Sequence, residues 1–518
     1  MSDTATKGLG RQVMVVLPGL MLAMLLAMLD NLIVGTSMPH IVGELGGASH
    51  LSWVVTAYVL ATTVSTPLWG KFGDLYGRKN FFMGSIVIFL AGSALSGLSQ
   101  SMTELIAFRA IQGLGAGGLM VGVMAIVGDL IPPRERGRFQ GYMAAMMAVA
   151  MVGGPLLGGF LTDHLSWRWS FYINLPLGLI TLAVIALKLH LPKHKVEHKI
   201  DYVGAGLLAA AAAALVLVAT WGGTQYDWVS TPIIGLLIGG LVALGAFVLV
   251  ERRVAEPILP LHLFKDRNFT TSSVLAFLVG FAMFGAVTFL PFYQQIVQGA
   301  SATNSGLLLL PMLGSMLVAM LATGRVITKT GHYRWFPVLG GALLTVGALL
   351  LSQVAVDTTR TTLSLYMAVF GLGIGFMMSI VQMLPQNSVQ AKDMGVASST
   401  STFFRSIGSS FGVSILGAVF ASRLSDGLSG AGAAGKQLAA AGTQMDPSKL
   451  NALPGAVRGA YEQAVTHAAS GVFGWAILFS AAAFVAALFI KAVPLRGAQA
   501  PKPEPRPEPE PELVDAMV

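Results

Sequence analysis

One acidic side chain, Asp30, lies within the body of a long apolar segment, where an ionised carboxylate is costly. The other Asp and Glu residues lie in loops, in tails or at the ends of apolar runs. A charge at the centre of a membrane helix costs ~2.5–3.5 kcal/mol even on a lenient scale, so it usually faces a partner or a cavity. Burial disfavours a charged carboxylate and a nearby cation favours it. Asp30 is therefore a candidate for taking up and releasing a proton.

Two basic residues, Arg109 and Arg405, also lie within apolar runs. Arg109 is about one turn into its run, at a depth similar to that of Asp30, so the two side chains could pair. The alternative for this pair is a static structural ion pair. Arg405 lies midway along a later run and could meet an anionic ligand or a backbone carbonyl. Further polar candidates for ligand contact are Asn31, Gln112 and Gln382.

The composition requires an apolar solvent around these residues. The chain has 518 residues, of which 54% are hydrophobic and only 11% are charged, whereas soluble domains carry roughly 25% charged residues. Fourteen runs are long enough to cross a bilayer. They lie near residues 13–37, 51–70, 81–99, 105–129, 138–161, 168–189, 202–220, 232–250, 268–292, 305–327, 335–353, 363–388, 396–420 and 470–491.

The positions of Lys and Arg predict the orientation. With the N-terminus inside, 24 of the 32 basic residues fall in cytoplasmic segments, as expected for a membrane protein. Both termini are therefore expected in the cytoplasm. The net charge of +8 then reflects topology, and we expect no nucleic-acid partner. The first run is too long for a signal-peptide core, and the absence of cysteine excludes thiolate chemistry.

Two pairs of landmarks recur at one offset, which predicts an internal duplication. Gly70 and Gly77 in the loop after the second run recur as Gly324 and Gly331, 254 residues later. Gly154 and Gly158 in the fifth run recur as Gly408 and Gly412 at the same offset. Duplicated halves of this kind place a substrate site between them near mid-membrane and rock about it.

The predicted organisation has five parts. Residues 1–12 form a cytoplasmic N-terminus, 13–190 a first six-helix bundle, and 191–267 two inserted spans with flanking loops. Residues 268–491 form a second six-helix bundle, which includes a long outer loop at 421–469. The tail 492–518 alternates Pro with Glu and should be a disordered cytoplasmic appendage.

The motifs, taken in order, resemble the fourteen-span drug:proton antiporter branch of the major facilitator superfamily. The resemblance covers most of residues 13–490 and rests on six stretches. These are LDNLIVGTSMP (29–39), GKFGDLYGRK (70–79), RAIQGLGAG (109–117), GGPLLGG (153–159), WRWSFYINLPLG (167–178) and FFRSIGSSFG (403–412). It implies an all-α membrane protein with the major facilitator fold, formed by two six-helix bundles plus two inserted helices, or 14 transmembrane helices.

The resemblance also assigns residues to a cytoplasmic latch that locks the outward-facing state. The latch residues are Gly70, Asp74, Gly77, Arg78 and Lys79, with Asp129 at the inner end of the fourth span. The alternative for Asp74 and Arg78 is a solvated surface pair of little weight. The repeated loop in the second half has Thr328 where an acid is expected, so its latch should be weaker.

A glycine-rich seam is expected in the fifth span. Gly153, Gly154, Gly158 and Gly159 leave one helix face without side chains, so that another helix can approach closely, and Pro155 permits a bend. The resemblance makes this face the seam about which the halves rock, and the alternative is packing alone.

The function implied is proton-coupled multidrug efflux, with Asp30 and Arg109 coupling proton entry to the export of a lipophilic small molecule. A dedicated exporter of one antibiotic or metabolite, possibly anionic, is the alternative, because Asp30, Arg109 and Arg405 together leave the core at +1. A membrane-embedded enzyme is disfavoured, since no span interior contains His. The expected protein is a monomer in the cytoplasmic membrane, with the lipid bilayer as its solvent and with no cofactor besides protons as the coupling ion.

Two further patterns carry alternatives. Phe277, Phe281 and Phe284 have helical spacing, so that Phe281 and Phe284 could line a drug pocket, although packed or lipid-facing aromatics are more common. HKVEH at 194–198 matches a zinc-protease pattern, but it lies in a Lys-rich loop without supporting ligands. We expect no metal site.

Overall fold

A computed structural model describes residues 3–45, 51–131, 133–189, 201–223, 225–254, 257–300, 307–390, 393–430 and 454–493. Within these ranges the secondary structure is helical, apart from an isolated bridge between Gly222 and Tyr226. Most of the expected tail and residues 431–453 of the expected outer loop fall outside the described residues. The other residues expected in that loop, 421–430 and 455–469, instead extend two helices.

The helices form two sets with an inserted pair between them. The N-terminal half consists of α1 (Asp3–Leu45), α2 (Leu51–Tyr76), α3 (Arg78–Leu98), α4 (Met102–Leu130), α5 (Pro133–His164), α6 (Trp169–Tyr172) and α7 (Asn174–Lys188). The inserted helices are α8 (Tyr202–Trp221) and α9 (Thr231–Glu251), followed by the 3-10 helix η2 (Leu261–Lys265). The C-terminal half consists of α10 (Arg267–Ile296), α12 (Leu310–Thr330), α13 (Trp335–Leu351), α14 (Arg360–Ser388), α15 (Met394–Gly430) and α18 (Gly455–Leu488).

Each of the fourteen expected spans falls on a described helix. Eleven of the described helices are long and apolar enough to cross a membrane, and α13 is a shorter apolar helix. Helices α2 and α5 do not meet that criterion. The all-helical membrane fold is therefore confirmed, while a count of fourteen crossings stays a prediction.

Side chains at the helix ends explain several boundaries. The Ser101 side chain accepts a hydrogen bond from the Glu104 N–H, and Glu104 accepts one from the Gln100 N–H, so α4 begins with a capping box. Asp201, Asp266 and Thr359 cap α8, α10 and α14 in the same way. These caps satisfy backbone N–H groups that would otherwise lack partners.

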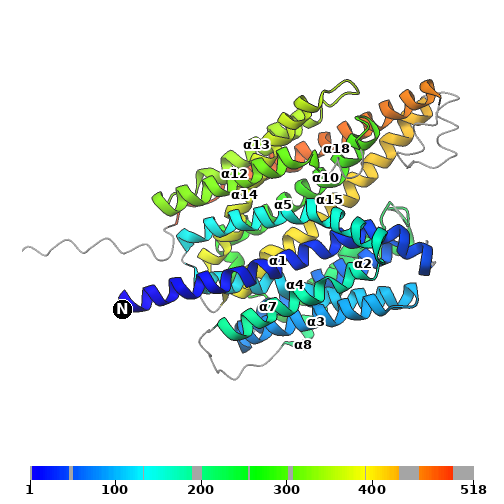
Figure 1. Cartoon of the computed structure of the whole chain (residues 1–518). Helices are drawn as coiled ribbons and strands as arrows, with labels where there is room; N and C mark the ends of the chain where they lie inside the picture. Colours follow the sequence, from blue (N-terminus) through cyan, green and yellow to red (C-terminus); the bar gives the residue numbers. More distant parts are fainter. Residues whose placement is uncertain are drawn as a thin grey trace, which may run out of the picture.

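The two halves repeat one packing pattern. In the N-terminal half α2 and α3 pack on α4, and α1 packs on α5 and α7. In the C-terminal half α12 and α13 pack on α14, and α10 packs on α15 and α18. Figure 1 shows α12, α13 and α18 on one side of the molecule and α1, α3 and α7 on the other. The helix pairings support the duplication that the glycine offsets predict.

Each half encloses its own apolar core. One buried cluster is built from α10, α12, α13, α14, α15 and α18, and a second from helices of the N-terminal half. Because the two cores are separate, either half can move as a body without losing its own packing.

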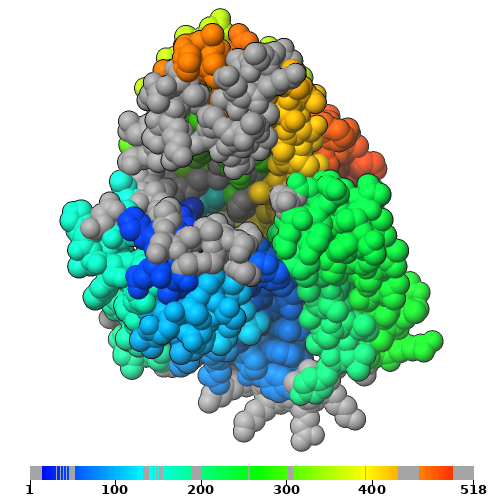
Figure 2. All heavy atoms as spheres, turned by 90° about the vertical axis from the view of Figure 1, so that its right-hand side faces the viewer, coloured from blue at the N-terminus to red at the C-terminus, as the bar shows by residue number. Residues whose placement is uncertain are grey.

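The halves touch at one end of the molecule, which we call the basic end because it carries Arg78, Lys79, Arg267 and Lys491. There α2 packs on α15 and α5 packs on α12. Figure 2 views the other end, called here the opposite end, and shows a hollow between the two halves. Helix α8 packs on both α2 and α15, and α9 packs on α8, so the inserted helices lie beside the junction.

Candidate functional site

Asp30 and Arg109 form a fully buried ion pair in the N-terminal half. Arg109 Nη1 lies 2.5 Å from Asp30 Oδ2, and neither side chain is exposed. Asp30 comes from the middle of α1 and Arg109 from the second turn of α4. The pairing expected from their similar depth is therefore present in the structure, and Asp30 does not face lipid.

Two amides complete the surroundings of the Asp30 carboxylate. Gln112 Nε2 and Asn174 Nδ2 each donate to Asp30 Oδ1 at 2.7 Å. Gln112 Oε1 also accepts from Arg109 Nη1 at 2.8 Å, and Asn174 donates to Ser93 Oγ at 3.0 Å. The carboxylate thus has three donors from two helices besides its own, one of them a guanidinium, which compensate its buried charge. We call Asp30, Arg109, Gln112 and Asn174 the acid network.

The guanidinium of Arg109 has further contacts that fix its position. Its Nε donates to the Val54 carbonyl oxygen at 3.4 Å, and its central carbon lies 4.1 Å from the centre of the Tyr58 ring. A cation over an aromatic face gains electrostatic energy, more so where water is excluded. The acid network therefore ties α1, α2, α4 and α7 together around one charge pair.

Sequence reasoning did not single out Asn174, Ser93 or Tyr58. Asn174 lies within the stretch WRWSFYINLPLG, whose resemblance to the family branch assigns no role to a single residue. The sequence could have indicated Asn174, because it is a polar side chain at the start of an apolar run. Only the tertiary structure shows that its amide reaches Asp30.

The other predicted ligand contacts are dispersed. The side chain of Asn31 is outside the described residues, although its backbone belongs to α1. Gln382 is buried on α14 and Arg405 is half-buried on α15, both in the C-terminal half. Gln382 and Arg405 therefore lie in the other half from Gln112 and the acid network.

The aromatic stripe of α10 is largely part of the core. Phe281 is fully buried and its ring stacks on Phe479 of α18, with ring centroids 3.7 Å apart. The pocket role expected for Phe281 is therefore corrected, because its ring is covered by α18. The side chain of Phe284 is not among those that the structure describes.

Asp74 joins the two halves at the basic end. Its Oδ1 and Oδ2 accept the backbone N–H groups of Gly395 and Val396 at 3.0 and 2.9 Å, at the start of α15. Its Oδ1 also lies 2.8 Å from Arg78, which in turn pairs with Asp129 of α4. An anion at a helix N-terminus is stabilised by unpaired N–H groups and by the helix dipole.

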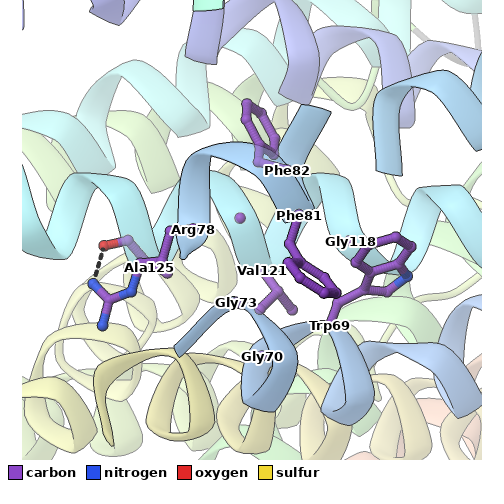
Figure 3. Close-up of a pocket in the computed structure, with 10 residues that line it drawn as sticks. Trp69, Gly70, Gly73, Arg78, Phe81, Phe82, Gly118, Val121 and Ala125 are labelled. Carbon is purple, nitrogen blue, oxygen red and sulfur yellow. Dashed lines mark hydrogen bonds between the residues drawn. The ribbon is translucent and has the colours of Figure 1, made fainter. Parts of the chain in front are cut away.

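The glycines of this loop meet two different needs. Gly77 has φ +102°, which side-chain-bearing residues rarely adopt. At Gly70 an added Cβ would lie 2.4 Å from Ser399 Oγ and 2.7 Å from the Gly395 carbonyl oxygen. Figure 3 shows Gly70 beside the small pocket that Trp69, Phe81 and Arg78 line. Gly70 therefore permits the close approach of α2 and α15.

Lys79 and the second-half loop make contacts within single halves. Lys79 Nζ donates to the Ala186 and Leu189 carbonyl oxygens at 2.7 Å, at the end of α7. In the second loop Gly331 has φ +73°, so the positive φ of Gly77 recurs at the 254-residue offset. Thr328 donates to the Gly324 carbonyl oxygen of its own helix, in contrast to Asp74.

The glycine seam of α5 is close-packed at one of the positions described. An added Cβ at Gly154 would lie 2.5 Å from Leu32 Cβ of α1, whereas at Gly153 and Gly159 it would meet no atom within 4 Å. Gly158 accepts a hydrogen bond from Thr162. Close helix approach therefore applies to Gly154 and not to Gly153 or Gly159. The Pro155 side chain lies outside the described part of the chain.

A family profile covers most of the chain. The profile described as "Major Facilitator Superfamily" matches residues 20–413. The chain belongs to this superfamily. It is therefore a multi-pass membrane transporter, and both its fold and its relatives are those of transporters.

Three bacterial relatives align over most of the chain. An uncharacterized MFS-type transporter, Rv1877, of Mycobacterium tuberculosis is 43% identical over 93% of this chain and 70% of its own length. The multidrug transporter protein MdtP of Bacillus subtilis is 40% identical over 78% of this chain and 75% of its own length. Multidrug resistance protein 3 of Bacillus subtilis is 40% identical over 83% of this chain and 84% of its own.

Solved structures of distant sequence share the fold. The human organic anion transporter MFSD10 (TETRAN) gives a TM-score of 0.59 at 16% identity, over 91% of this chain and 99% of its own. The proton:xylose symporter XylE gives 0.59 at 12% identity, over 91% and 95%. Among the described residues no group of three or more His, Asp or Glu could hold a metal ion, and HKVEH lies outside them.

Proposed function

We propose that this protein exports lipophilic drugs or toxic compounds across the cytoplasmic membrane by antiport with protons. The relatives named as multidrug transporters, which align over more than two thirds of both chains, support drug efflux. The observation that carries proton coupling is the acid network, because a buried carboxylate with a dedicated arginine partner is the arrangement in which a change of protonation alters helix packing.

A physical route connects Asp30 to the junction between the halves. Protonation of Asp30 removes the charge that Arg109, Gln112 and Asn174 surround, and thereby weakens the attachment of α1 to α4 and α7. Helix α1 packs on α5 next to Gly154, and an added Cβ at Gly141 of α5 would lie 2.1 Å from Leu321 of α12. A shift of α1 is therefore transmitted to the basic end through α5.

The described state supports alternating access. The halves meet at the basic end through Asp74 and the start of α15, while the hollow opens at the opposite end. The Lys and Arg distribution favours a cytoplasmic location for the basic end and for both termini. In this reading the state is outward-facing and the Asp74 contacts are its latch. We expect the transporter to act as a monomer and to need no cofactor.

The alternative is a dedicated exporter of one antibiotic or metabolite. The observation that favours it is Arg405, a cation in the C-terminal half for which the described residues provide no ion pair. Transport of chemically unrelated dyes would distinguish the two, since a dedicated exporter discriminates among them.

The test compares wild type with Asp30→Asn in sealed proteoliposomes with an imposed pH gradient. Gradient-driven export of a lipophilic dye should fall at least about tenfold, to the level of protein-free vesicles, because the amide cannot exchange a proton at neutral pH. Dye exchange without a pH gradient should persist in the variant, which shows that it is folded and inserted.

Asp227→Asn is the matched control, because Asp227 is an exposed acid between α8 and α9. Its gradient-driven export should equal that of wild type. Unchanged export by Asp30→Asn would remove Asp30 as the proton site, and no export of any dye by wild type would overturn the proposed function.

A further inference from the structure

We propose that Arg405 on α15 binds the anionic group of exported molecules, so that the substrates include amphiphilic anions such as sulfonates and carboxylates. This inference rests on the proposed function, and names the substrate class of the site between the halves. Four observations carry it: the missing partner of Arg405, the face of α15 on which it lies, the polar side chains beside it and the charge balance of the interior.

Arg405 differs from Arg109 in having no partner among the described residues. Arg109 is paired with Asp30 and bonds Gln112 and Val54. For the Arg405 guanidinium, the described part of the chain offers neither a carboxylate nor a hydrogen-bond acceptor. A guanidinium carries five N–H donors in a planar fork that matches a carboxylate or sulfonate. An anionic ligand is the missing complement.

The other faces of α15 are already covered. Gly408 and Gly412 pack against the backbone of α10 at Phe277 and Phe281. Ser401 donates to the Val381 carbonyl oxygen of α14. Phe403 and Ile407 are buried in a cluster with side chains of α8 and α2. At 3.6 residues per turn, Arg405 lies about 20° from Gly412, at the edge of the face that α10 covers. Its side chain is nevertheless only half-buried.

Helix α15 lies beside the hollow between the halves. Helix α15, drawn in yellow, borders the hollow in Figure 2, and α4 of the N-terminal half packs on α15 from across the junction. This part of α15 does not face lipid, because α8 packs on both α2 and α15 and covers their junction. A ligand in the hollow can therefore reach Arg405.

Polar side chains lie beside Arg405. Thr402 and Ser406 lie on the side of Arg405 that is turned away from Gly412, and both are half-buried. Ser409 donates to the Arg405 carbonyl oxygen and lies against Gly280 of α10. A polar, half-buried strip in the middle of an apolar helix is typical of a surface that lines a cavity.

The charge balance favours anions over cations. Asp30 compensates Arg109 within the acid network, whereas Arg405 has no counter-charge in the part of the chain that the structure describes. A cationic ligand would meet repulsion there, whereas an anion removes the cost of leaving a guanidinium without a partner in a membrane-spanning helix.

Anion export by proton antiport has an electrical consequence. One proton entering and one monovalent anion leaving together move two positive charges inward. The same exchange with a neutral molecule moves one, and with a monovalent cation it moves none. An interior-negative potential should therefore accelerate the export of an anion most.

The test uses two pyrene probes that differ in one group, 1-pyrenesulfonate and the neutral 1-pyrenemethanol. Binding to the purified protein is measured by fluorescence in a nonionic detergent free of anionic lipid, so that no lipid headgroup competes. Wild type should bind the sulfonate more tightly. In Arg405→Gln the ratio of the two affinities should fall roughly tenfold to a hundredfold, as expected for a lost hydrogen bond to a charged group.

Two further variants keep the test decisive. Arg405→Lys retains the charge without the planar fork, so it should keep part of the preference for the sulfonate. Arg334→Gln removes an exposed arginine at the basic end and should leave both affinities unchanged. An unchanged ratio in Arg405→Gln, or equal affinities in wild type, would overturn the anion site.

Export in proteoliposomes with an imposed potential separates this inference from the proposed function. Faster export of pyrenesulfonate under an interior-negative potential supports the anion site. Gradient-driven export of cationic dyes without any export of the sulfonate overturns the anion site alone. Absence of all gradient-driven export overturns the proposed function, whereas the binding ratio still decides the anion site.

Discussion

The two halves of this transporter share a helix pattern but differ in where they hold charge. At the 254-residue offset, Asp30 corresponds to Phe284 and Arg109 to Leu363. The N-terminal half thus contains a satisfied ion pair where the C-terminal half has apolar residues. Conversely, the buried cation of the C-terminal half, Arg405, corresponds to Met151. The duplication determines how the helices pack, while single substitutions determine which half binds a proton and which meets a ligand.

The loops at the basic end likewise share a backbone conformation but differ in one side chain. Gly77 and Gly331 adopt the same positive φ, so the backbone turn is common to both halves. Asp74 reaches the start of α15 in the other half, whereas Thr328 bonds the carbonyl of its own helix. In the N-terminal half the acid of this turn therefore links the two halves.

Replacing Arg109 and Arg405 in turn gives the sharpest test of the difference between the two halves. Arg109→Met leaves the buried Asp30 without its cation and should destabilise the protein by about 3–5 kcal/mol. Arg405→Met leaves no acid behind among the described residues, so its free energy of unfolding should change by less than about 1 kcal/mol. Unfolding in mixed micelles measures both, and equal losses would contradict the difference between the halves.

The glycine seams should respond unequally to a single methyl group. In Gly408→Ala the new Cβ would lie 2.1 Å from the Phe277 backbone oxygen, and in Gly154→Ala 2.5 Å from the Leu32 side chain. Overpacking costs about 1–3 kcal/mol, and a backbone oxygen yields less easily than a side chain. Gly408→Ala should therefore lower the thermal unfolding temperature more than Gly154→Ala. Gly153→Ala, which meets open space, is the control.

The two loops differ in how strongly they hold the halves together. Asp74→Asn loses charge-assisted hydrogen bonds worth about 1.5–3 kcal/mol, so the latch should open more often. Because the chain has no cysteine, Ser399→Cys next to Gly70 can report opening by its alkylation rate. The rate should rise about tenfold or more with Asp74→Asn. It should change little with Thr328→Val, and equal changes would show that the acid is not what joins the halves.

The opposite end should show the smallest effect, and one carboxylate of the N-terminal half gives it a pH dependence. Glu44 accepts hydrogen bonds from Arg168 at 2.5 Å and Trp167 at 2.7 Å, and the bond from Arg168 is the main cause that lowers the pKa of Glu44. In the C-terminal half Tyr293 donates to the Ala355 carbonyl oxygen, and Glu462 pairs with Arg458 one turn away on its own helix.

Glu44→Gln should cost under about 1 kcal/mol at neutral pH, since the pair is partly exposed. A lowered pKa in the folded state adds stability that is fully present above the unfolded value of about 4.3 and is lost as pH falls through the folded value. Wild type and Glu44→Gln should thus converge in unfolding free energy once the pH falls below the lowered folded value, under about 4.3. A difference that persists there would mean that the carboxylate charge does not stabilise this end.

The sequence alone determined the all-helical membrane fold, and it indicated the duplication and the possible pairing of Asp30 with Arg109. Hydrophobic runs, the excess of Lys and Arg on one side and the depth of a buried charge are local properties, and each follows from the cost of exposing polar groups to lipid. The family motifs also located the loop that carries Asp74.

Only the tertiary structure decided which polar groups surround Asp30, where Asp74 is bonded and which aromatic rings are covered. Asn174 lies 144 residues from Asp30 in the chain, and Phe281 is enclosed by α18 rather than facing a pocket. Contacts of this kind depend on how whole helices cross, and no spacing within one helix specifies them.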